Sequence, residues 1–202
     1  MQKMMKWMAA MAFVGFTNMA AAEVAPDALV KKTAEDVLAV VKQDKEIQAG
    51  NQSKIFALAE EKILPNFNFD RVSRLVLGKA WSKATPDQKK AFQDEFRSLL
   101  LRTYATALSK YSNQTIEYKP FRAQPGDTDV KVKTQILQPG GQPVAVDYSL
   151  EKNGEGWKVY DITIEGVSLV TNYRGQFSNE IRQAGLDSLI EKLAAKNRES
   201  SK

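Results

Sequence analysis

The sequence predicts an α+β protein in which a small curved antiparallel sheet is flanked by N-terminal and C-terminal helices. Apolar side chains recur every three or four residues over 26–111, which is the spacing of amphipathic helices. Over 113–165 the spacing changes to two, interrupted by glycine-bearing turns, and helical spacing returns over 167–197. Helices and strands that are segregated along the chain in this way are typical of the α+β class.

The first 22 residues have the order of a secretory signal peptide. Lys3 and Lys6 precede an apolar run over 7–16, and Ala20, Ala21 and Ala22 supply the small residues of a cleavage site. An uncleaved membrane anchor is the alternative, but a membrane span needs about 20 apolar residues. No cysteine follows the apolar run, which excludes lipid attachment there. We therefore expect cleavage after Ala22 and export of the mature chain.

Cleavage would leave 180 of the 202 residues, which suits one domain over 23–197 followed by a polar tail over 198–202. The residues from Lys196 onward are expected to fray. Removing Lys3 and Lys6 lowers the 29 basic residues to 27, against 24 acidic ones. An excess this small, spread along the chain, gives no reason to expect a nucleic-acid partner.

The residue types that the chain lacks narrow its chemistry. Without cysteine there is no disulfide, and without histidine the usual zinc and copper sites lose their preferred ligands. The commonest general base and the Ser-His-Asp triad are absent for the same reason. No Gly-x-Ser-x-Gly, phosphate-loop or calcium-loop pattern occurs. An enzyme is not expected, and neither is a metal or another cofactor.

Three helices are predicted before residue 80. Asp27 is the expected N-cap of the first, the second follows Gly50-Asn51 and ends at Pro65, and the third covers 70–79. Their apolar stripes are Val30, Ala34, Val37 and Val41; Ile55, Phe56, Ala59 and Ile63; and Val72, Leu75 and Val76.

A long helix is predicted to begin at Pro86 and to end near Leu108. Thr85 is its expected N-cap, and Gln88 completes a capping box. The run 99–101 is Leu-Leu-Leu, which sweeps about 200° around a helix, wider than the stripe of a helix buried on one side. This helix should therefore contact more than one neighbour.

Strands are predicted over 114–121, 129–136, 144–150 and 157–164, the last three joined by short turns as an antiparallel meander that ends at Gly166. Two strands alternate cleanly. Their inward positions are Val130, Val132, Thr134 and Ile136, and Val144, Val146, Tyr148 and Leu150.

The strand over 157–164 is apolar on both sides of a strict alternation. One side holds Trp157, Val159 and Thr163, and the other holds Tyr160, Ile162 and Ile164. The strand either lies between two layers of ordinary core or turns one face toward an apolar ligand pocket. Asp161 is expected to bond nearby backbone or hydroxyl donors; a catalytic base is the alternative role.

The final segment is predicted to be helical with one break. Tyr173, Phe177 and Ile181 recur every four residues, and Gly185 interrupts the pattern. The apolar positions after the break are Leu186, Leu189, Ile190 and Leu193.

Two stretches of the chain carry a family resemblance. Residues 73–111 contain "LVLG", "ATPDQ" and "LRTYATAL", and residues 157–177 contain "YDITIEGVSLV". Together they closely resemble the periplasmic phospholipid carriers of the Mla system, the MlaC or toluene-tolerance auxiliary component family. The resemblance covers essentially the whole mature chain.

The resemblance implies a nuclear-transport-factor-two-like sheet with an added helical lobe, holding one phospholipid by its acyl chains as cargo. It implies shuttling between an outer-membrane lipoprotein–porin complex and an inner-membrane ABC transporter with an MCE-domain ring, which maintains outer-membrane lipid asymmetry. We expect a monomer. The alternatives are a periplasmic adaptor, a carrier for another hydrophobic ligand, and a carboxylate-dependent enzyme with Asp161 as its base.

Periodicity supplies the candidate pocket wall, and for every residue in it packing in the core remains the alternative. The candidates are Leu75, Val76, Phe96, Leu100, Tyr104, Val132, Ile136, Val146, Tyr148, Ile162, Ile164, Val167, Tyr173 and Phe177. Arg71, Lys79 and Arg174 are the cations considered for a head-group phosphate, with solvated surface as the favoured interpretation of each.

Overall fold

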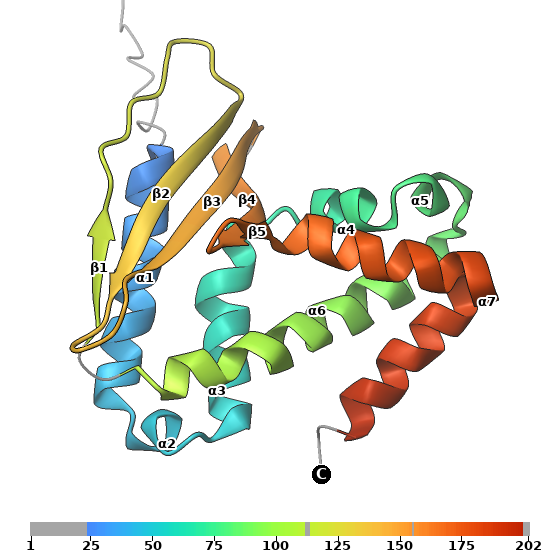
Figure 1. The fold of residues 1–202 in the computed structure, drawn as a ribbon, viewed down its shortest axis with the longest axis horizontal. Coiled ribbons are helices and arrows are strands. Elements are labelled where there is room, and N and C mark those ends of the chain that lie inside the picture. The colour runs from blue at the N-terminus through green and yellow to red at the C-terminus, as the bar shows by residue number, and fades with distance from the viewer. Residues whose placement is uncertain (1–23, 112–113, 155, 200–202) are drawn as a thin grey trace, which may run out of the picture.

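A computed structural model describes residues 24–111, 114–154 and 156–199. Figure 1 shows a sheet on one side of the molecule and a lobe of helices on the other, with the long helix α6 joining the two. The predicted α+β class, with a small antiparallel sheet flanked by helices, is confirmed. The predicted signal peptide and the end of the predicted tail lie outside the described residues.

The N-terminal helices are α1 (Pro26–Gln43), α2 (Lys45–Gln48) and α3 (Gln52–Leu58). The prediction that Asp27 caps α1 is wrong: Ala25 is the N-cap, and Asp27 lies in the first turn, where its charge suits the helix dipole. Helix α2 was not predicted, since four residues are too few to show a period. Its N-cap is Asp44, which accepts from the N–H groups of Glu46 and Ile47.

Two short irregular turns follow α3. Ala59–Ile63 forms a π-helical turn and Leu64–Asn66 a 3-10 turn, so the predicted second helix does end around Pro65. Such π-turns often occur at functional sites. This one places Ala59 and Ile63 on the wall of a cavity.

The helical lobe begins with α4 (Phe69–Leu77), α5 (Lys79–Lys83) and α6 (Pro86–Ser109). The predicted capping box is confirmed: the N–H of Gln88 donates to Thr85 Oγ1 at 3.2 Å, and the N–H of Thr85 donates to Gln88 Oε1 at 3.0 Å. Leu99 is buried in the lobe's core, whereas Leu100 and Leu101 face a cavity, so α6 does meet several neighbours.

The sheet contains β1 (Thr115–Tyr118), β2 (Asp129–Leu137), β3 (Val144–Asn153), β4 (Gly156–Ile164) and β5 (Val167–Ser168), paired antiparallel in that order. Strand β5 was not predicted. Glu165 and Gly166 both have positive φ, of 49° and 81°, as a tight hairpin turn requires. The sheet therefore continues one short strand beyond Gly166.

A β-bulge explains the two-sided pattern of β4. The β3–β4 register pairs Leu150 with Val159 but Ser149 with Asp161, which leaves Tyr160 as the extra residue. The bulge shifts the alternation by one position. Trp157 and Val159 before it therefore share a face with Ile162 and Ile164 after it, opposite Lys152, Leu150, Tyr148 and Val146. The prediction that these two pairs face opposite sides of the sheet is wrong.

Helix α7 (Leu169–Glu199) follows the sheet, and Gly185 interrupts it with φ 86° and ψ 170°, as predicted. The prediction that the chain frays from Lys196 is wrong for the described residues, since α7 continues to Glu199 and Asn197 is buried. The Asn197 amide donates to the carbonyl and the carboxylate of Glu95. Among residues 24–111, 114–154 and 156–199, no helix is both long and apolar enough to cross a bilayer.

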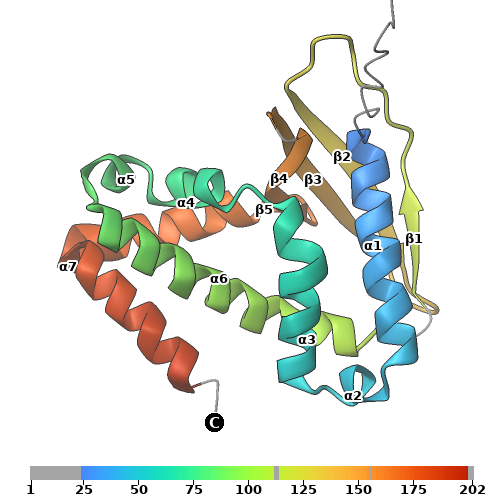
Figure 2. The ribbon, with the colours of Figure 1, turned by 180° about the vertical axis from the view of Figure 1, so that it is seen from behind.

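Within the part of the chain that the structure describes, the buried apolar residues form three separate clusters. One fills the lobe of α4, α5, α6 and α7, a second joins α1 to α2 and α3, and a third lies between α1 and the inner face of the sheet. Figure 2 shows α1 lying across that inner face. Because the three clusters do not merge, apolar surface in the middle of the molecule remains available to line a cavity.

Candidate functional site

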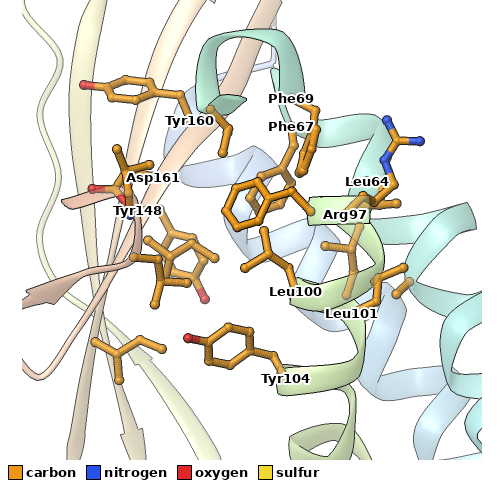
Figure 3. A pocket seen from close by; sticks show the side chains of 18 of the residues that line it. Leu64, Phe67, Phe69, Arg97, Leu100, Leu101, Tyr104, Tyr148, Tyr160 and Asp161 are labelled. Atoms are coloured by element: carbon orange, nitrogen blue, oxygen red, sulfur yellow. The ribbon is translucent and has the colours of Figure 1, made fainter. Parts of the chain in front are cut away.

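The first cavity lies where the three clusters approach one another, between α6, α4, the π-turn and the inner face of the sheet. Its volume is about 350 Å³. Figure 3 shows Leu100, Leu101 and Tyr104 of α6 on one side and Tyr148 of β3 on the other, with Phe67 and Phe69 near the top. The wall is almost wholly aliphatic and aromatic, as expected of a site for an apolar ligand.

A second cavity, of about 470 Å³, adjoins the first. It lies between α1, the C-terminal end of α6 and the sheet. The two cavities have a shared wall, made of Ile63, Phe67, Leu108, Ile136, Tyr148 and Ile162. Each volume lies within the range of about 300–1,000 Å³ found for small-molecule sites.

Eight of the fourteen wall candidates come together around the first cavity. These eight are Phe96, Leu100, Tyr104, Ile136, Val146, Tyr148, Ile162 and Ile164. The strand members lie on the inner face of the sheet. Ile162 and Ile164 belong to this group because the bulge at Tyr160 turns them inward.

The other six candidates do not line either cavity. Val76, Tyr173 and Phe177 are buried in the helical lobe, where the rings of Tyr173 and Phe177 meet that of Phe96 edge to face at centroid distances of 5.1 and 5.4 Å. Val132 is buried between the sheet and α1, Leu75 is half-buried on α4, and Val167 is exposed at the β4–β5 hairpin. The spacing of apolar residues along the sequence identified the apolar faces of these elements. It did not show whether each face packs in the core or lines a cavity.

Two tyrosines bring hydroxyl groups to the apolar wall. Burial raises the pKa of Tyr148 to about 12, with a smaller contribution from Tyr118, while a hydrogen bond with Thr134 opposes the shift. Burial likewise raises the pKa of Tyr104 to about 12, together with its electrostatic interaction and hydrogen bond with Tyr173. Both hydroxyls stay protonated at neutral pH, so they add no charge to the wall.

Asp161 has the structural role predicted for it. Its Oδ2 accepts from Ser168 Oγ at 2.6 Å, and its Oδ1 accepts from the N–H of Val170 at 3.0 Å. Ser168 Oγ in turn accepts from the N–H of Thr171 at 3.0 Å. These bonds satisfy N–H groups in the first turn of α7 and fix the helix to β4.

None of the three cations considered for a head group lines either cavity. Arg71 forms ion pairs with Glu151 and with Asp129, and its guanidinium lies 3.7 Å from the centroid of the Tyr160 ring. Lys79 and Arg174 are exposed on the helical lobe. Sequence reasoning instead missed Arg97 of α6, a cation that does line the first cavity.

Several apolar wall residues were also missed. Leu64 and Phe67 belong to the short segment between the π-turn and α4, where apolar residues show no regular spacing, and Phe69 is the first residue of α4. The N–H of Asn68 donates to the carbonyl of Val159 at 2.9 Å, which holds this segment against β4. Leu169 and Val170 begin α7. The described residues contain no group of three side chains suited to a metal ion.

An α+β protein whose sheet and helices enclose adjoining apolar cavities belongs to the class of proteins suited to binding a hydrophobic ligand. The model of the family described as "MlaC protein" matches residues 31–195. The chain belongs to the MlaC family.

Two curated relatives and one solved structure are similar along most of the chain. Toluene tolerance protein ttg2D of Pseudomonas putida is 29% identical over 163 residues, covering 80% of this chain and 75% of that protein. The intermembrane phospholipid transport system binding protein MlaC of Haemophilus influenzae is 28% identical over 202 residues, covering 93% of this chain and 91% of that one. A phospholipid-binding protein from Ralstonia solanacearum, solved with a phospholipid, is 45% identical with a TM-score of 0.82, covering 87% of this chain and 98% of that one.

Proposed function

We propose that this protein is a periplasmic phospholipid carrier, with residues 23–197 as a single lipid-binding domain behind a cleaved signal peptide. It takes up a phospholipid by its acyl chains and moves it between an inner-membrane ABC transporter with an MCE-domain ring and an outer-membrane lipoprotein–porin complex. In doing so it maintains lipid asymmetry in the outer membrane. The observation that carries the proposal is the pair of adjoining apolar cavities between sheet and helices. The phospholipid bound by the 45% identical neighbour supports it.

Transfer free energies explain why such a cavity suits a carrier. The two acyl chains of a phospholipid hold about 30 methylene groups. Moving them from a bilayer into water costs on the order of 20 kcal/mol of free energy, at ~0.8 kcal/mol per methylene. Binding the chains against an apolar wall avoids most of that cost. Because the bilayer avoids a similar amount, the free-energy change of loading or unloading lipid at a membrane complex can be close to zero.

The wall performs this role without covalent chemistry. Each carboxylate oxygen of Asp161 accepts a hydrogen bond, from Ser168 or from Val170, which supports a structural role for this group. The hydroxyls of Tyr104 and Tyr148 are protonated because their pKa values are about 12. A carrier that is not an enzyme, holds phospholipid as cargo and uses no cofactor accounts for these features.

A vesicle experiment tests the proposal. Donor vesicles of phosphatidylethanolamine and phosphatidylglycerol, with a radiolabel in the phospholipid, are incubated with the mature protein and then removed by centrifugation. We expect labelled lipid to remain with the protein in the supernatant and to pass to unlabelled acceptor vesicles added later. A supernatant protein that carries no label would contradict the carrier function and favour an adaptor, or a carrier for a different hydrophobic ligand.

A further inference from the structure

Arg97 is a charged side chain on an otherwise apolar wall. Of the described residues that line the first cavity, it alone carries a positive charge. Its Nε is buried and has no hydrogen-bond partner, and its guanidinium carbon lies 5.1 Å from the centroid of the Phe69 ring. Arg97 lines the first cavity, and Figure 3 shows its side chain running away from the strands, with the guanidinium on the outer side of the apolar side chains.

None of the nearby carboxylates among the described residues forms an ion pair with Arg97. Asp94, one turn earlier on α6, pairs with Lys90, and Glu95 accepts from Asn197. Asp161 lines the same cavity, but its oxygens accept from Ser168 and Val170. A guanidinium donor that is removed from water without a partner is unfavourable, and an anion beside it restores the lost interaction.

We propose that Arg97 binds the phosphodiester of the lipid head group and so fixes which end of the paired cavities holds the polar part of the lipid. This assignment rests on the proposed function. The planar guanidinium presents several donors in a fork that matches phosphate oxygens, which makes arginine suited to this contact. The Phe69 ring beneath it supplies an apolar surface that holds the guanidinium plane at the edge of the cavity.

The spacing along α6 supports this orientation. The side chains of α6 that line the first cavity extend from Phe96 and Arg97 to Leu108, which also lines the second cavity. Eleven residues of helix separate Arg97 from Leu108, or about 16 Å at 1.5 Å per residue. One leaflet of a bilayer's hydrocarbon core is about 15 Å deep, half of the total of about 30 Å. An acyl chain that starts beside Arg97 therefore reaches the wall shared by the two cavities.

Lys110 offers the competing position for the phosphate. It lines the second cavity near Gln114 and Gln138, at the far end of α6. Lys110 is exposed, however, so water already solvates its ammonium group and an anion adds less there. The buried, unpartnered nitrogen of Arg97 favours the α4 end of α6 for the head group.

A pair of lipids with the same acyl chains tests the assignment. Delipidated protein is incubated with vesicles that contain phosphatidylglycerol or diacylglycerol as the labelled lipid, and native mass spectrometry gives the fraction of protein with each lipid bound. We expect the wild type to favour phosphatidylglycerol over diacylglycerol, and Arg97→Gln to reduce that preference by roughly 10- to 100-fold, as for loss of a charge-assisted hydrogen bond. Excess inorganic phosphate should not displace the bound phosphatidylglycerol.

Arg102→Gln is the matched control. Arg102 lies on the same helix, also has a buried Nε without a hydrogen-bond partner, and also lies over an aromatic ring, that of Phe56 at 5.3 Å, but it lines neither cavity. It should keep the wild-type preference, and so should Lys110→Gln. Thermal melting of each delipidated variant shows that it is folded.

The possible results separate the two claims. If the wild type binds both lipids equally, or if Arg97→Gln keeps the preference, the role of Arg97 is wrong while lipid carriage stands. A loss of preference in Lys110→Gln instead places the phosphate at the other end of the cavities. Displacement by inorganic phosphate would show that the anion site serves free phosphate. If the wild type takes up neither lipid, the proposed function fails, and the role of Arg97 fails with it.

Discussion

Replacing Ile164 with phenylalanine distinguishes a cavity wall from a packed core. Ile164 is half-buried, lines the first cavity and belongs to none of the three buried clusters. Val132 is its matched control, because it lies on the same face of the same sheet but is only 1% exposed and is packed against α1.

The two substitutions should act in different ways. Val132→Phe overpacks a filled core, which costs ~1–3 kcal/mol. At about 2–4 °C per kcal/mol for a domain of this size, its melting temperature should fall by about 2–12 °C. Ile164→Phe instead adds about three carbon atoms to open space, so the melting temperature should change by no more than about 2 °C. The ring displaces about three methylene groups of the lipid, worth ~2.4 kcal/mol or roughly a 50-fold loss of affinity.

The assay combines thermal melting with native mass spectrometry. Melting is measured on delipidated protein, because bound lipid stabilises the folded state by mass action and its loss would lower the melting temperature on its own. Lipid occupancy is then measured after incubation with phospholipid vesicles. If Ile164→Phe melts as far below the wild type as Val132→Phe does and takes up as much lipid as the wild type, Ile164 is core and the cavity assignment is refuted.

Three further predictions concern what holds the cavity's surroundings in place. Thr85→Ala removes one half of the capping box of α6 and should lower the free energy of unfolding by about 1 kcal/mol in urea titrations; an unchanged value would show that the cap adds nothing. Arg71→Gln should lower the free energy of unfolding by about 1–3 kcal/mol, because the partly buried Glu151 is left without its ion pair. Arg74→Gln breaks an exposed pair with Asp70 and should lower it by less than about 0.5 kcal/mol. Equal effects of the two substitutions would contradict this prediction. Tyr148 has a pKa raised from 10.0 to about 12 by burial, so the unfolded chain ionises first and stability is lost as pH rises from 10 to about 12. Tyr148→Phe should flatten the stability curve over that interval by about 2–3 kcal/mol, and an unflattened curve would show that this hydroxyl is not buried in the folded state.

Local signals in the sequence predicted the features that depend on neighbouring residues. The Thr85–Gln88 capping box and the break at Gly185 each rest on a few adjacent residues, and both are present. The order of helices, then a sheet, then a helix follows from the spacing of apolar residues alone. The cap of α1 was misplaced because Ala25, a residue with no capping side chain, is the N-cap, and Pro26 begins the helix.

The bulge at Tyr160 is the clearest feature that the alternation of apolar and polar residues did not predict. A single extra residue inverts the alternation of a strand, so a strict period of two assigns Trp157 and Ile162 to opposite faces although they share one. No residue type in β4 marks the position of the bulge. Its consequence for the site is direct, because four apolar residues of β4 share the inward face and supply both core and cavity wall: Trp157, Val159, Ile162 and Ile164.

The sequence also did not distinguish filled from open space. Phe96 and Phe177 each lie on the apolar stripe of a helix, yet Phe96 reaches the cavity wall and Phe177 is enclosed between α6 and α7. That difference depends on how far apart the helices lie, which is set by contacts between residues distant in sequence. Arg97 was missed for a related reason: on a helix rich in charged residues, only the packing around it shows that its Nε is buried.

Native mass spectrometry of the protein, purified without detergent from the cells that express it, is the sharpest test of lipid binding. We expect a species heavier than the bare chain by the mass of a phospholipid, and solvent extraction should then release that phospholipid. A protein that carries only its own mass and yields no phospholipid on extraction would contradict the claim that the adjoining cavities hold a lipid.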